Sequence, residues 1–137
     1  MKTKITLLTW MAVNNEPNAL ESLLKKLGQK YDVEKVIYLY QKEYAEKLEK
    51  VKPLSSAINP VEVNVKNPTA HKEIYEIIKR EILPMVNDAP NLFINVSSGT
   101  PAMHSVWLIL YAGGVFPDAT RLISSQINRK TGGTTCD

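Results

Sequence analysis

Residues 95–104 bring together residue types that could hold a negatively charged ligand. The segment reads Asn-Val-Ser-Ser-Gly-Thr-Pro-Ala-Met-His and begins within an apolar run at 91–96 that predicts a buried strand. Pro101 suits the first position of a helix and Thr100 suits its N-cap. The first backbone N–H groups of a helix lack partners within it and carry the positive end of its dipole. The segment therefore predicts an anion or phosphate cradle between a strand and a helix.

The side chains of this loop support the same expectation. Gly99 lets the backbone approach a ligand closely. Hydroxyl groups come from Ser97, Ser98 and Thr100. The N–H groups expected to point outward belong to Ala102, Met103 and His104. Ordinary helix capping produces the same pattern of residues, so the alternative that this loop only caps a helix stays open.

The sequence lacks the motifs of several other kinds of site, namely nucleotide-triphosphate, dinucleotide and zinc sites. No lysine follows Gly99 as a Walker loop requires, and no Gly-x-Gly-x-x-Gly follows the first predicted strand. A single cysteine, Cys136, and two histidines, His71 and His104, argue against a structural zinc site. A histidine at position 104 is more often a capping or packing residue than a catalyst. We expect neither a metal nor an organic cofactor.

A second candidate loop follows the first predicted strand, which ends at Thr9. Trp10 offers a flat face on which a base could stack, and Asn14 could hydrogen-bond a base edge. The alternative is that Trp10 packs in the core while Asn14 and Asn15 turn the chain. Both readings stay open.

The elements that must position these loops alternate between two hydrophobic periods. Segments with strand character lie at 4–9, 33–40, 61–65, 91–96 and 119–124. Segments with helical spacing lie at 16–29, 42–51, 69–86 and 101–113. This alternation predicts an α/β, Rossmann-like three-layer sandwich with a mainly parallel sheet of about five strands and helices on both faces. The usual strand order places the first and fourth strands side by side, so the loops after Thr9 and Val96 should share one crevice.

Length and composition indicate one globular domain. The chain has 137 residues, 44% of them hydrophobic, and a net charge of +3 that is too small to indicate nucleic-acid binding. The longest uncharged stretches are broken by proline and polar residues, so no membrane span is expected. A single cysteine argues for a reducing, cytoplasmic compartment. We place the domain at 1–127 and a polar tail, leading into a missing effector region, at 128–137.

The segment 101–113 contains no formal charge. A helix that is apolar on nearly every side must be buried on nearly every side. We therefore expect a homodimer formed through this helix. The alternatives are that the tail or a missing domain covers it.

Residues 95–107, Asn-Val-Ser-Ser-Gly-Thr-Pro-Ala-Met-His-Ser-Val-Trp, together with 119–125, resemble the CARF (CRISPR-associated Rossmann fold) domains. They look most like the N-terminal sensor domain of RNA-repair-type enhancer-binding (sigma-54) transcriptional regulators. The resemblance implies a dimer whose crevices bind a cyclic oligoadenylate or a related RNA-derived ligand, such as an RNA end. It also implies an attached effector, through which alone the protein would contact DNA.

The resemblance assigns roles residue by residue. The residues that would hold the phosphates and riboses are Ser97, Ser98, Gly99 and Thr100, with Met103 and His104 nearby. The contributors from the first strand and its loop would be Thr9, Trp10 and Asn14. Some CARF domains also cleave their ligand, so a metal-independent ring nuclease is the alternative to a sensor. A third possibility is an interaction domain that only dimerises a regulator.

Overall fold

The computed structural model describes residues 2–127 and 134–136 and contains one parallel sheet in the order β3-β2-β1-β4-β5. Its strands are β1 (Thr3–Trp10), β2 (Tyr31–Tyr40), β3 (Ile58–Glu62), β4 (Leu92–Asn95) and β5 (Arg121–Ile123). The central strand β1 pairs with β2 on one side and with β4 on the other. The first and fourth strands are therefore neighbours, as predicted.

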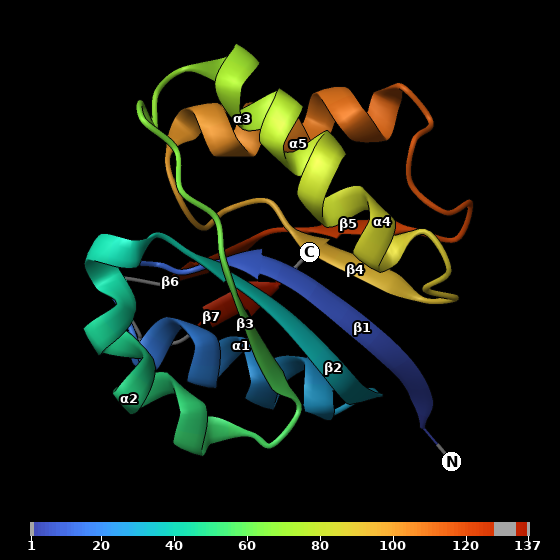
Figure 1. The fold of residues 1–137 in the computed structure, drawn as a ribbon. Coiled ribbons are helices and arrows are strands. Elements are labelled where there is room, and N and C mark those ends of the chain that lie inside the picture. Colours follow the sequence, from blue (N-terminus) through green and yellow to red (C-terminus); the bar gives the residue numbers. More distant parts are fainter. Residues whose placement is uncertain (1, 128–133, 137) are drawn as a thin grey trace.

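Helices cover both faces of the sheet (Figure 1). One face carries α1 (Asn18–Gly28), a 3₁₀ segment (Lys42–Lys47) and α2 (Leu48–Val51). The other carries α3 (His71–Ile77), a π-helical turn (Ile78–Ile82), α4 (Leu83–Val86) and α5 (Pro101–Ala112). Each face has its own apolar core, because β-branched and leucine side chains on alternate strand positions point to opposite helical layers. The predicted sandwich of helices around a parallel sheet is confirmed.

Several predicted boundaries were wrong. The helix predicted at 69–86 is interrupted by the π-helical turn, because Pro84 has no N–H to donate one turn back. The third strand is Ile58–Glu62 rather than 61–65, since these residues form the ladder with β2, which ends with the Val63 N–H bonded to the Tyr40 carbonyl at 2.8 Å. The helix predicted at 42–51 begins as a 3₁₀ helix over Lys42–Lys47.

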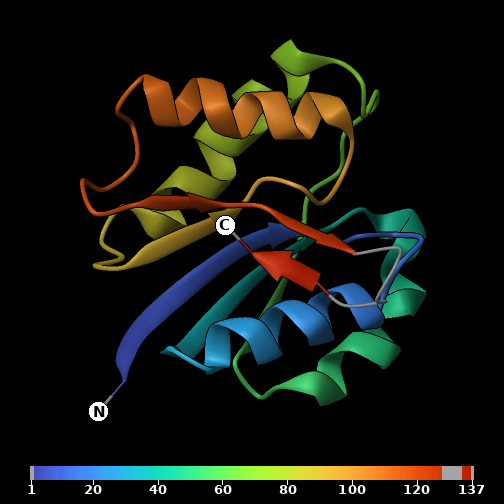
Figure 2. The same ribbon diagram turned by 180° about the vertical axis from the view of Figure 1, so that it is seen from behind.

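Two short strands near the end of the chain form a second, small sheet. The fifth strand shortens to Arg121–Ile123, and β6 (Ser125–Ile127) then pairs antiparallel with β7 (Thr134–Cys136). β7 lies beside α1 (Figure 2). The rest of the predicted tail, 128–133 and 137, lies outside the described residues. None of the helices in the described part of the chain is long and apolar enough to cross a membrane.

Candidate ligand-binding site

A cleft of about 350 Å³ opens at the carboxyl ends of β1, β2 and β4. Its described lining residues are Trp10, Met11, Ala12, Val13, Asn14, Asn15, Leu39, Tyr40, Gln41, Tyr44, Pro68, Ser97, Ser98, Gly99, Thr100 and Met103. The loops after the first and fourth strands thus meet in one hollow, at the edge where parallel α/β sheets bind ligands. None of the described lining residues is charged.

The buried amide of Asn95 organises the loop after β4. Its Nδ2 donates to Thr9 Oγ1 at 3.1 Å and to Ser98 Oγ at 3.0 Å. Its Oδ1 accepts from the Ser97 N–H at 3.2 Å and from the Ser97 hydroxyl at 2.8 Å. Asn95 is only 2% exposed, so water does not compete for these hydrogen bonds. They are stronger in this low-dielectric environment and hold the loop firmly. The amide joins the end of β1 to both serines.

Gly99 and Thr100 shape the turn into α5. Gly99 has a φ of +94°, a conformation that favours glycine. Thr100 is the N-cap: its Oγ1 accepts from the Met103 N–H at 3.3 Å and donates to the Pro68 carbonyl at 2.7 Å. Thr100 and Met103 both line the cleft, so the positive end of the α5 dipole lies at it.

The N–H groups at the start of α5 are less open than predicted. The Met103 N–H is taken by Thr100 Oγ1, and the His104 N–H bonds to the Thr100 carbonyl at 3.1 Å. The expectation of free, outward-pointing donors is therefore wrong for these two residues. The threonine that ends the loop caps the helix with both its hydroxyl and its carbonyl oxygen, which competes with any ligand for those donors.

Among the residues singled out at the end of β1 and in the loop after it, Trp10 is buried, whereas Asn14 and Asn15 are exposed. Trp10 is 3% exposed and packs into the core beneath α5, while also lining the cleft. Its Nε1 is buried and has no hydrogen-bond partner among the described residues. Asn14 and Asn15 are exposed at the cleft, and the Asn15 N–H closes a turn onto the Ala12 carbonyl. A base could reach the asparagines more readily than the indole face.

Two of the predicted site residues do not line the cleft. Thr9 is buried and uses its hydroxyl within the protein, accepting from Asn95 and donating to the Trp10 carbonyl at 3.2 Å. His104 is half-buried on α5, and its Nε2 has no partner among the described residues. The other seven predicted residues all lie at the cleft. They are Trp10, Asn14, Ser97, Ser98, Gly99, Thr100 and Met103.

Five lining residues come from parts of the chain that the sequence did not single out. Leu39 and Tyr40 end β2, the other neighbour of β1, and Gln41 and Tyr44 follow it. Pro68 belongs to the segment before α3 and accepts the Thr100 hydroxyl. The tyrosines at the end of the strand predicted at 33–40 were the sequence feature that could have indicated this part of the cleft.

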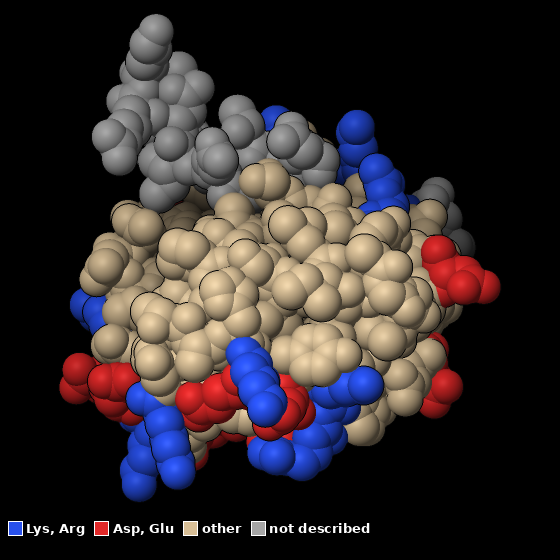
Figure 3. Space-filling model, turned by 90° about the horizontal axis from the view of Figure 1, so that it is seen from above, with Lys and Arg blue, Asp and Glu red and all other residues tan. Residues whose placement is uncertain are grey.

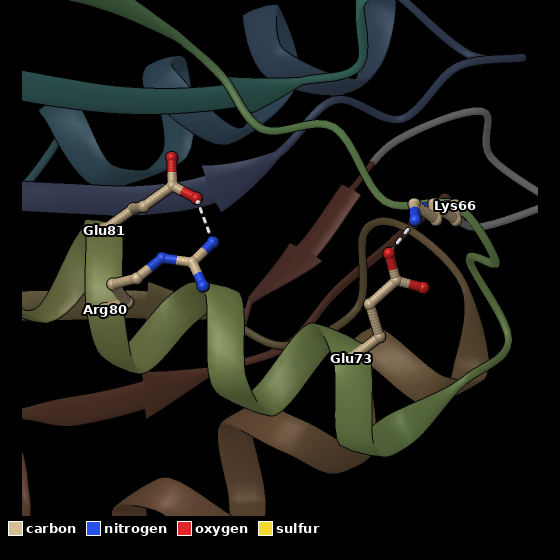
Figure 4. Close-up of polar contacts among 4 residues, drawn as sticks. All are labelled: Lys66, Glu73, Arg80 and Glu81. Carbon is tan, nitrogen blue, oxygen red and sulfur yellow. Dashed lines mark hydrogen bonds and ion pairs between the residues drawn. The ribbon is translucent and has the colours of Figure 1, made fainter.

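Glu73 fixes the segment that carries Pro68 (Figure 4). Its carboxylate accepts from the backbone N–H of Lys66 at 2.6 Å and of Asn67 at 3.0 Å. These two backbone hydrogen bonds lower the pKa of Glu73. The ion pair between Arg80 and Glu81 in the same view is solvent-exposed and contributes little.

Glu16 ties the loop after β1 to two other elements. One carboxylate oxygen accepts from the Leu20 N–H of α1 at 2.9 Å, and the other accepts from the Tyr38 hydroxyl of β2. Burial raises the pKa of Glu16, against the lowering effect of hydrogen bonds from Tyr38, Leu20 and Ala12. Burial and the nearby carboxylate raise the pKa of Tyr38 as well.

The substitution Glu16→Gln should stabilise the protein at neutral pH. A raised carboxyl pKa means that the folded chain binds the proton more tightly than the unfolded chain, so wild-type stability falls as pH rises from 4.5 through the raised pKa. Glutamine keeps hydrogen-bonding atoms at both positions without the buried charge. Denaturant unfolding at several pH values should show the two proteins converging below pH 4.5. A variant that is less stable than wild type at neutral pH would contradict this account.

Within the described residues, no group of three or more histidine, cysteine, aspartate or glutamate side chains is placed to hold a metal ion.

No protein-family model matches the chain, and no curated protein matches it. Solved structures do. Csm6 from Enterococcus italicus, bound to cyclic hexa-2'-fluoro-hexa-dAMP, superposes with a TM-score of 0.68 at 17% identity, over 92% of this chain and 34% of that chain.

The chain has a Rossmann-like fold. Can2 from Sulfobacillus thermosulfidooxidans, in complex with cyclic tetra-adenylate, superposes on it with a TM-score of 0.60 at 16% identity. That match covers 94% of this chain and 36% of Can2. The Rossmann-like chain thus spans about a third of the length of each of these structures.

Proposed function

We propose that this chain is a CARF-type sensing domain that binds a cyclic oligoadenylate, or a related RNA-derived ligand, in the cleft. The observation that carries the proposal is the meeting of the Ser97–Thr100 loop with the loop after β1 in one hollow. Two proteins of the same fold, Csm6 and Can2, are bound to cyclic nucleotides of this class, which supports the choice of ligand.

The cleft suits a phosphodiester that is recognised without fixed positive charge. The Ser98 hydroxyl accepts from Asn95 Nδ2 and can donate its own proton to a phosphate oxygen, and the α5 dipole favours the negative charge. Asn14 presents an exposed amide for a base edge. The Trp10 Nε1, buried without a partner among the described residues, is a donor that a small movement could offer to the ligand.

Calorimetric titration tests the ligand directly. We expect cyclic tetra-adenylate or cyclic hexa-adenylate to bind this chain and to raise its melting temperature. Linear adenylates of the same length, with and without a terminal phosphate, separate ring recognition from recognition of an RNA end. If none of these compounds gives heat or a thermal shift, the proposed ligand class is wrong.

We further propose that a second copy of the chain covers the outer face of α5. Leu108, Ile109 and Tyr111 on this face are 51%, 52% and 44% exposed. The helical layer seen from above presents a broad area without charged side chains, bordered by basic and acidic side chains (Figure 3). Since α5 begins at the cleft, pairing through it would set two clefts about a two-fold axis, which matches the symmetry of a ring with an even number of adenylates.

Ile109→Glu should convert the dimer to a monomer. A carboxylate placed at the centre of an apolar interface loses its hydration without gaining a partner, and this costs several kcal/mol. Sedimentation at micromolar concentration measures the effect. Met85→Glu is the matched control, because Met85 is 45% exposed on α4, outside the α5 face. A wild-type chain that sediments as a monomer would contradict the dimer.

An effector completes the proposed role. The chain covers about a third of Csm6 and of Can2, so a sensing domain of this size leaves room for a further region in a longer protein. We propose that ligand binding controls such an effector in the cytoplasm, for example a transcriptional activator of the sigma-54 type that supplies the contacts with DNA.

A metal-independent ring nuclease is the second candidate on the same cleft. The Ser98 hydroxyl, fixed by the Asn95 amide, could hold a phosphodiester in line for attack by the adjacent ribose 2'-hydroxyl, which forms a 2',3'-cyclic phosphate, breaks the bond to the 5'-oxygen of the next nucleotide and passes its proton to that oxygen. Incubation of cyclic tetra-adenylate with the protein and chelator separates the two functions. Linear products that disappear in Ser98→Ala favour the nuclease, and an intact ring favours the sensor.

A further inference from the structure

A second hollow, of about 220 Å³, lies at the opposite edge of the sheet from the cleft. It opens where β2 and β5 begin, beside the end of α1, and its described lining includes Lys26, Lys30 and Arg121. No acidic side chain is among its described lining residues. Three cations thus surround a small concave space on a chain whose net charge is only +3.

Two aromatic residues orient the guanidinium of Arg121. Its Nη1 donates to the Tyr31 hydroxyl at 3.0 Å, and its Cζ lies 5.2 Å from the centre of the Phe93 ring. Tyr31 and Phe93 themselves pack edge to face, with ring centres 4.9 Å apart. A guanidinium has five N–H donors and Tyr31 takes one of them, so the rest of the fork is held in place for a planar or tetrahedral anion.

These cations have no acidic partner in residues 2–127. The ion pairs there join Lys25 to Glu21 and Arg80 to Glu81, and neither involves the hollow. Asp32 lines the adjoining hollow, together with Lys2 and Lys4, and not this one. Among residues 2–127, therefore, nothing neutralises the positive charge around Arg121 by a direct ion pair.

Lys26 and Lys30 lie near the C-terminal end of α1, where a lysine could serve only to offset the helix dipole. Lysines near the last turn of a helix commonly offset the negative pole of its free carbonyls. Here the Gly28 carbonyl at the end of α1 already accepts a hydrogen bond from the ammonium of Lys2. The ammonium of Lys2 thus offsets part of the negative pole that would repel an anion, and Lys26 and Lys30 add positive charge beside it.

We propose that this hollow is a phosphate-binding site, separate from the cleft, that takes the phosphate of a nucleotide or of a nucleic-acid end. The fork of Arg121 matches two phosphate oxygens, and the two lysines add unoriented positive charge. A volume of about 220 Å³ suits one phosphate group rather than a whole drug-sized ligand. The site does not depend on what the cleft binds.

Titration of ¹⁵N-labelled protein, followed by NMR, tests the site. Inorganic phosphate, adenosine monophosphate and a 5'-phosphorylated RNA hexamer should all shift the signals of Lys30, Tyr31 and Arg121. The same hexamer without its phosphate distinguishes a phosphate site from a general attraction to RNA. Signals of Gly99 report on the cleft and should not move with inorganic phosphate.

Variants decide the outcome. Arg121→Gln should weaken phosphate binding about tenfold or more, because it removes the charged fork. Lys30→Gln is an exposed substitution that cannot unfold the chain, and it should weaken binding about threefold. Lys50→Gln, an equally exposed lysine on α2, removes the same charge elsewhere and should leave binding unchanged. Equal losses in both lysine variants, no shift near Arg121, or hexamer binding that ignores the phosphate would each overturn the proposal.

Discussion

Gly99→Ala should lower the affinity for a cyclic oligoadenylate about a hundredfold. At φ +94° an added Cβ would lie 2.7 Å from Met103 Sδ and 3.3 Å from Trp10 Cβ. Met103 cannot move freely, because it is 3% exposed and its sulfur accepts from the Thr100 N–H at 3.3 Å. The loop must therefore shift, and with it the Ser98 hydroxyl that we assign to the ligand. Calorimetric titration of the variant measures the loss.

Gly114→Ala supplies the matched control. Gly114 also has a positive φ, of 71°, but an added Cβ there would meet nothing within 4 Å. Both alanine variants should lose about 1–2 kcal/mol of unfolding free energy from backbone strain, while only Gly99→Ala should lose the ligand. Equal affinity of the two variants would refute the assignment of Gly99 to the site.

Asn95→Ala should cost about 2–4 kcal/mol of unfolding free energy and abolish detectable ligand binding. The amide makes two donor and two acceptor contacts at a site that is 2% exposed. Without it, the hydroxyl of Thr9 stays buried with a lost partner, and the Ser97 N–H loses its acceptor. Chemical denaturation and calorimetry together measure both effects.

Asn91→Ala is the comparison for this substitution. Asn91 precedes β4 at its other end, and its Nδ2 donates a hydrogen bond of 3.1 Å to the Lys4 carbonyl. We expect a loss of about 1 kcal/mol and normal ligand binding. If both asparagine variants bound the ligand as wild type does, Asn95 would be a structural residue only.

The sequence predicted the strand, loop and helix around 91–113 because local rules decide them. Pro101 and Thr100 can start a helix without help from the rest of the chain, and the structure has Thr100 as the N-cap. The third strand was misplaced for a non-local reason. Val63 and Val65 are buried and continue the alternation of apolar and polar residues that predicts a strand. The ladder between β2 and β3 nevertheless ends at Glu62.

The site was only partly predictable, since which face a residue presents depends on tertiary register. Thr9 and Trp10 are adjacent on β1 and point to opposite faces, so only one of them reaches the cleft. Tyr40 and Gln41 reach the cleft because β2 is the neighbour of β1. The order of the strands decides this, and a local sequence pattern does not contain it. The Asn95 network joins residues 86 positions apart, which no local window contains.

The position of β1 at the centre of the sheet has a consequence for synthesis on the ribosome. The first half of the chain can pair β1 with β2, and β2 with β3, as it emerges, but the other edge of β1 stays open until β4 arrives. The bond from Asn95 to Thr9 forms only then. A nascent chain stalled before residue 95 would hold half of a folded sheet and no recognition pocket, and would display an unprotected strand edge to chaperones.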